Sequence, residues 1–89
     1  MISSLVQQKV KDFAVWKKAF DSIAGARASY GQLSEKVFQD ASDPNLVTIL
    51  IKWESLEKGQ KWFQSPELKA AQAKAGLDGP IAVSLLKEV

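Results

Sequence analysis

The chain has 89 residues, of which 46% are hydrophobic, and its 12 basic and 10 acidic residues give a net charge of +2. This length and composition predict a single globular domain over residues 1–89 and exclude a disordered chain. The absence of cysteine and histidine excludes disulfides, thiolate nucleophiles, zinc sites and histidine-based acid–base catalysis. The charges are dispersed without a concentrated basic stripe, so we expect no nucleic-acid partner.

No hydrophobic run reaches the roughly 18 residues that a membrane-spanning helix needs. Met1 leads directly into a strand-like segment, and no signal peptide is visible. We therefore expect a cytoplasmic protein without a membrane partner.

The N-terminal segment predicts a strand followed by a helix. Residues 2–10 alternate weakly, with Ile2, Ser4, Val6, Gln8 and Val10 in one row and Leu5 in the other.

The helix is expected from the N-cap Asp12 to about Tyr30, with Gly31 as its left-handed last residue. Gly25 lies inside this helix and can mark a bend. Residues at spacings of three and four share one face of it: Phe13, Trp16, Phe20, Ile23, Ala24, Arg27 and Tyr30.

Residues 32–40 and 46–54 predict two strands, joined as a hairpin by the turn formers of residues 40–45. The second strand has the clearest alternation in the chain. One row is wholly apolar and the other is half apolar, so both faces of the strand are expected to be covered. The apolar row is Val47, Ile49, Ile51 and Trp53, and the mixed row is Leu46, Thr48, Leu50, Lys52 and Glu54.

The remaining sequence predicts two short helices and a final strand. Ser55 can cap the first helix, and Ser65 with Pro66 begins the second, which Gly76 ends. A turn then leads into a strand over residues 81–89. The apolar face expected on the first of these helices is Leu56, Gly59 or Gln60, and Phe63.

This order is β-α-β-β-α-β, the ferredoxin-like pattern of the α+β class, with an antiparallel sheet and helices on one of its faces. The helices leave the other face bare, although Leu46 and Leu50 belong to it. An exposed apolar face on a small protein indicates an interface, so we expect a homodimer that packs sheet against sheet.

Several segments carry a family resemblance along nearly the whole chain. They are Val10–Phe20, Arg27 with Gly31, Asp43–Asn45, Trp53–Glu57, Ser65–Leu68 and Ala75–Gly76. With these segments the chain resembles the dimeric α/β-barrel superfamily and, more narrowly, small members of the antibiotic-biosynthesis monooxygenase-like group.

The resemblance implies a dimer, no cofactor, and a substrate cavity between sheet and helices lined by Trp, Asn, Arg and Tyr. Trp53 matches a tryptophan frequently found at the end of the third strand. Ile49 and Leu50 stand where the polyketide oxygenases have an asparagine. The activity implied is cofactor-independent oxygenation of a small aromatic or apolar molecule, in which the substrate's own carbanion reacts with oxygen. The alternative is a homodimer that binds a small molecule without catalysis, or is only structural.

The candidate ligand-binding residues are Arg27, Tyr30, Trp53, Trp16, Phe20 and Phe63, and no catalytic residue or metal ligand is identified. Arg27 can hold an anionic or phenolate substrate. Alternatively, it neutralises carbonyls at the helix end or pairs with Glu35 or Asp40. The aromatic residues are either core or cavity lining, with the Tyr30 hydroxyl expected in solvent.

The amides of Gln7, Gln8 and Gln39 can also supply hydrogen bonds to a ligand. A void of roughly 300 Å³ or more that reaches solvent and touches Arg27 would favour ligand binding, and solid packing there would rule out the enzyme interpretation.

Overall fold

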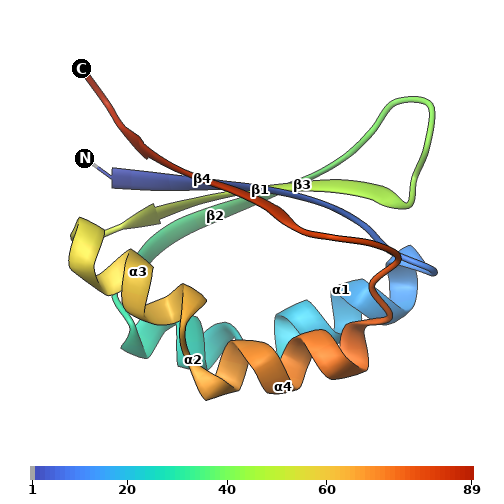
Figure 1. Cartoon of the computed structure of the whole chain (residues 1–89), viewed down its shortest axis with the longest axis horizontal. Coiled ribbons are helices and arrows are strands. Elements are labelled where there is room, and N and C mark those ends of the chain that lie inside the picture. Colours follow the sequence, from blue (N-terminus) through green and yellow to red (C-terminus); the bar gives the residue numbers. More distant parts are fainter. Residues whose placement is uncertain (1) are drawn as a thin grey trace.

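The computed structural model describes residues 2–89 and shows a four-stranded antiparallel sheet with all its helices on one face (Figure 1). The strand order is β2-β3-β1-β4, which confirms the predicted ferredoxin-like fold. Each helical region is divided in two, so the element order is βααββααβ. The elements are β1 Ile2–Lys9, α1 Phe13–Ser22, α2 Ala24–Ser29, β2 Gln32–Gln39, β3 Leu46–Trp53, α3 Leu56–Phe63, α4 Pro66–Ala75 and β4 Ala82–Lys87.

The inner face of the sheet is formed by the rows that the alternation predicts. Val47, Ile49, Ile51 and Trp53 of β3 are at most 4% exposed. In the neighbouring strand β1, the inward row of Ser4, Val6 and Gln8 is also buried. These residues pair across the two strands, with Val6 opposite Ile49 and Gln8 opposite Val47, so they form one continuous floor under the helices.

The first helical region breaks at Ile23, two residues before the bend predicted at Gly25. Ile23 has φ −110° and ψ 18°, outside the helical range, and separates α1 from α2. The carbonyl of Phe20 has two donors at this break. In a continuous helix it would accept from the amide of residue 24, but here it accepts from Nη1 of Arg27 at 2.6 Å and from the amide of Ile23 at 3.4 Å.

The predicted helix ends are confirmed by their hydrogen bonds. The Asp12 carboxylate accepts from the amides of Ala14 and Val15 at 2.9 and 3.3 Å. Ser55 and Ser65 cap α3 and α4 through their hydroxyl oxygens, each at 3.2 Å from a backbone amide. Gly76 ends α4 with φ 70°, a left-handed conformation that favours glycine.

One predicted helix face needs correction. The buried residues of α3 are Gly59 and Trp62, while Leu56 is 44% exposed and Phe63 is half-buried. Gly59 lies directly over the Trp53 ring, so the helix meets the sheet along the line from Gly59 to Trp62.

The outer face of the sheet has no helix over it (Figure 1). Leu5, Phe38 and Leu86 lie on this face with 38%, 50% and 44% of their surface exposed, and Leu50 is half-buried. Every residue of the edge strand β4 is exposed. Within residues 2–89, no helix is both long and apolar enough to cross a membrane.

Candidate functional site

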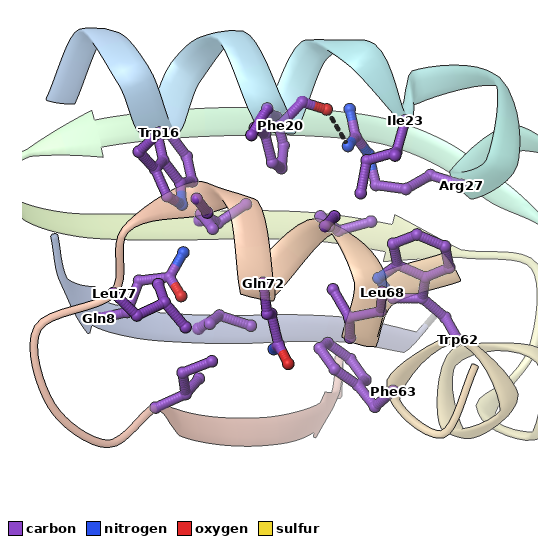
Figure 2. Close-up of a pocket in the computed structure, with 17 residues that line it drawn as sticks. Gln8, Trp16, Phe20, Ile23, Arg27, Trp62, Phe63, Leu68, Gln72 and Leu77 are labelled. Carbon is purple, nitrogen blue, oxygen red and sulfur yellow. Dashed lines mark hydrogen bonds between the residues drawn. The ribbon is translucent and has the colours of Figure 1, made fainter. Parts of the chain in front are cut away.

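A narrow cavity lies between the sheet and the helix layer (Figure 2). Its floor is the inner face of β1 and β3, and its walls come from α1, α2, α3 and α4 together with Leu77 and Ile81. It is partly open to solvent, and its volume is about 60 Å³. One buried water needs roughly 10–15 Å³, whereas sites for drug-sized ligands measure roughly 300 Å³ or more. The interior is therefore not solidly packed, but the void is smaller than the roughly 300 Å³ that would favour ligand binding.

Aromatic side chains from two separate helices line this cavity. On α1, Trp16 and Phe20 stack with ring centroids 5.0 Å apart and an interplanar angle of 18°. Both are buried, as their spacing of four residues on the apolar face predicts. Trp62 and Phe63 of α3 add the facing aromatic surface (Figure 2). The helix α4 contributes the smaller side chains Ala71 and Ala75, and also Leu68 and Gln72.

Arg27 is the one ionisable residue among those that line the cavity, and it is only 1% exposed. Its Nε donates to Gln32 at 2.8 Å, and its Nη2 donates to both carboxylate oxygens of Glu35 at 3.2 and 3.1 Å. Burial lowers the pKa of Arg27, and the charge of Glu35 opposes this change.

With Nη1 on the Phe20 carbonyl, every nitrogen of the guanidinium has a protein acceptor. The group also stacks on the Phe20 ring, with its central carbon 3.7 Å from the ring centroid. The alternative to substrate binding predicted that Arg27 would bind a helix-end carbonyl or pair with a carboxylate. The Phe20 carbonyl and Glu35 are partners of these two kinds.

Two of the candidate residues lie outside the cavity lining. Trp53 is fully buried in the core, where its indole N–H donates to the Ser4 hydroxyl at 3.0 Å. Tyr30 packs the edge of its ring against Trp62, at a centroid distance of 5.5 Å. Its hydroxyl is not directed only to solvent, as predicted, but donates to Glu67 of α4 at 2.7 Å.

The cavity therefore brings together Trp16, Phe20, Arg27 and Phe63 from the predicted set. The prediction missed Trp62 as a site residue. The sequence signal for it is its spacing of three from Gly59, a residue already expected on the apolar face of this helix. Of the three glutamines considered, only Gln8 reaches the cavity. Gln39 donates instead to the carbonyl of Pro44 at 3.2 Å.

A second hollow lies on the helix layer, between α1–α2 and α4. It is larger, about 540 Å³, but it is a more open surface groove. Alanines and the charged residues Lys18, Glu67 and Lys74 line it. Within residues 2–89, no group of acidic residues is placed to hold a metal ion.

The element order and the strand order define the class: small α+β proteins of ferredoxin-like fold with one helix layer. The model of the antibiotic biosynthesis monooxygenase family matches residues 11–74. The chain belongs to this family.

Solved structures share the fold across the whole chain. The putative antibiotic biosynthesis monooxygenase from Bordetella bronchiseptica has a TM-score of 0.85 at 14% identity, over 99% of this chain and 96% of that one. The cofactor-independent oxygenase SnoaB from Streptomyces nogalater has a TM-score of 0.83 at 11% identity, over 99% and 92%. A putative monooxygenase from Caulobacter crescentus has a TM-score of 0.82 at 19% identity, over 99% and 89%. No curated protein matches the chain significantly.

Proposed function

We propose that this protein binds a small, largely apolar or aromatic molecule in the cavity under α4, and oxygenates it without a cofactor. The observation that carries the binding is the incompletely filled space between the Trp16–Phe20 stack, Trp62 and Phe63. Oxygenation without a cofactor is proposed from membership of the family and from the fold shared with SnoaB.

The chemistry needs an acidic C–H bond in the substrate. Loss of its proton gives a carbanion, which transfers an electron to O₂, and a carbon–oxygen bond then forms. Loss of water from the resulting peroxide leaves a carbonyl, so that CH₂ and O₂ become C=O and H₂O. The contribution of the protein is to desolvate the substrate and to orient it against the aromatic walls of the cavity.

One observation favours binding without catalysis. A general base has to lie within hydrogen-bond reach of the proton that it removes. Arg27 is the one ionisable residue of the lining, and it is paired with Glu35. The substrate must then ionise without a protein base, or the protein only binds its ligand.

The cavity volume also limits the ligand. At about 60 Å³ the void is smaller than the roughly 150 Å³ of an engineered cavity that binds benzene, so even a ligand with one ring requires α4 to move outward. This helix is the least buried wall of the cavity, since Ala75 is its only residue classed as buried.

The experiment combines a thermal-shift screen of quinols and phenols with measurement of oxygen uptake. Ligands should raise the melting temperature of the protein. Ala71→Leu, which fills the cavity from α4, should abolish the shift, whereas Ala70→Leu, on the outer groove, should keep it. Oxygen uptake with a carbonyl product supports the oxygenase, and binding without uptake supports the non-catalytic alternative. Absence of any shift would contradict both.

We also propose that the protein is a homodimer whose subunits pack through the outer face of the sheet. Leu5, Phe38 and Leu86 expose apolar surface there, with Leu50 between them. A second copy buries the same patch from both sides, which is the interface of a twofold dimer.

A further inference from the structure

We propose that Gln8 and Trp16 form the polar anchor of the cavity, and that they select a neutral ring compound bearing a carbonyl group. This inference rests on the proposed function, because it names the ligand class of the same cavity. It moves the recognition of the polar group away from Arg27.

Gln8 is a buried amide without a protein partner. It is 7% exposed, it faces the helices from the inner row of β1, and it lines the cavity. Among residues 2–89 its side chain makes no hydrogen bond, although no fully enclosed side-chain polar atom lacks a partner. The amide must therefore retain contact with the open space of the cavity. A polar group placed among apolar side chains is costly unless it is hydrogen-bonded, so this position suits a ligand that supplies the missing partner.

The indole N–H of Trp16 is a second polar group of the cavity lining that has no hydrogen-bond partner within the described residues. The residue is 2% exposed. Its ring stacks on Phe20 and also packs against the Phe13 ring, with 5.7 Å between the Trp16 and Phe13 ring centroids. Its indole N–H has no acceptor within the described residues, whereas the indole N–H of Trp53 donates to Ser4. Figure 2 shows the nitrogen of Trp16 and the amide of Gln8 turned toward the same part of the cavity, from opposite walls.

The vacant hydrogen-bonding capacity of the cavity is uncharged. Gln8 offers one acceptor and one donor group, and Trp16 offers one donor. Arg27 is not available, because its nitrogens already donate to Phe20, Gln32 and Glu35 and its charge is balanced. An anionic ligand would be buried without a free cation, which is costly. A neutral carbonyl can accept from Trp16 and Gln8, and a neighbouring N–H or O–H can donate to the Gln8 oxygen.

Three compounds of matched shape test the assignment: benzamide is neutral and polar, benzoate is anionic, and toluene is apolar. Each is titrated into ¹⁵N-labelled protein, and the indole N–H resonance of Trp16 is followed after its assignment with Trp16→Phe. Benzamide should bind roughly five- to tenfold more tightly than toluene, the effect of about one hydrogen bond, and should shift the Trp16 resonance. Benzoate should bind most weakly.

In Gln8→Leu the preference for benzamide over toluene should disappear while toluene still binds. Gln7→Leu is the matched control, because Gln7 lies next in the strand but on the outer face and should leave the preference unchanged. Gln8→Leu should also melt at a higher temperature than the wild type, whereas a purely structural glutamine would make it melt lower. Tightest binding of benzoate, or a benzamide preference that survives Gln8→Leu, would contradict the anchor formed by Gln8 and Trp16. Neither result would contradict the proposed function. If none of the three compounds binds, the cavity is not a binding site and the proposed function fails with it.

Discussion

Arg27 connects three elements through one side chain. It belongs to α2, it bonds the Phe20 carbonyl at the end of α1, and it pairs with Glu35 of β2. A guanidinium is suited to this task because its fork of donors can serve several acceptors at once. The residue is therefore first a structural one, and its contribution to a ligand site is limited to one wall.

Removal of this side chain should destabilise the protein. Arg27→Met removes one donor from the carbonyl of Phe20 and leaves the carboxylate of Glu35 without its ion-pair partner, at a cost of about 3 kcal/mol. This cost lies at the low end of the range of about 3–5 kcal/mol for breaking a buried ion pair, because the Glu35 side chain is 32% exposed. Urea unfolding measures the change. Arg27→Lys keeps the charge but not the fork and should fall between Met and wild type, and a loss below about 1 kcal/mol in Arg27→Met would contradict this role.

Tyr30 allows a direct titration because it is the only tyrosine in the chain. Its hydrogen bond to Glu67 raises its pKa above the ordinary value of about 10, with smaller effects from desolvation and from the charge of Glu67. Since the pKa in the folded state is the higher one, the stabilising effect is present below pH about 10 and is lost as the pH rises through the folded value.

Absorbance of the ionised phenol should therefore develop at a higher pH in the wild type than in Glu67→Ala. Glu57→Ala is the control, since that carboxylate pairs with Lys61. Equal titration curves for wild type and Glu67→Ala would show that the contact between α2 and α4 does not form in solution.

At the scale of elements, the approach of α3 to the sheet depends on one glycine. A Cβ atom at Gly59 would lie 3.3 Å from two atoms of the Trp53 ring. That ring is fully buried and held by its bond to Ser4, so it has little freedom to move away. The close contact sets the height of α3 over the sheet, and with it the position of Trp62 at the cavity.

Two glycine-to-alanine substitutions should consequently change the free energy of unfolding in opposite directions. Gly25 lies exposed in α2, and a Cβ there meets nothing within 4 Å, so Gly25→Ala should stabilise the protein by about 0.5–1 kcal/mol. Gly59→Ala gains the same helix propensity but presses on Trp53, and a net loss of about 1 kcal/mol is expected. Thermal or urea unfolding compares the two. A stabilised Gly59→Ala would mean that the helix and ring can separate without cost.

At the scale of the whole molecule, the sheet has one covered and one uncovered face (Figure 1). Its inner rows are buried by the helices, while the outer row retains apolar residues such as Leu5 and Phe38. The homodimer proposed above would give the two faces of the sheet comparable cover.

Light scattering at micromolar concentration should give twice the 9.8 kDa mass of one chain. Phe38→Glu, on the outer face of the edge strand β2, should weaken the dimer at least about tenfold, because it places an unpaired charge in an apolar interface. Val15→Glu is the matched control. Val15 and Phe38 are similarly exposed, at 51% and 50%, but Val15 lies on the helix layer. A wild-type particle of 9.8 kDa would contradict the dimer.

Features that depend on neighbouring residues could be predicted from the sequence. Alternation has a period of two, so it assigned Val47, Ile49 and Ile51 to one face of β3 without knowledge of the helices. Side-chain capping acts over two or three residues, so Asp12 and Ser65 marked helix starts correctly.

Features that join distant segments could not be predicted in this way, because they depend on how the elements pack. Next to the helix break at Ile23, the Arg27 side chain reaches the Phe20 carbonyl and Glu35 of another element, and local propensity does not encode these contacts. Tyr30 and Glu67 are 37 residues apart, so their contact depends on how α2 and α4 pack. Alternation put Gln8 on the inner face, but its free amide reflects the space that the packed helices leave above it. Strand and helix signals are local, whereas a binding site is formed by what several elements leave unfilled between them.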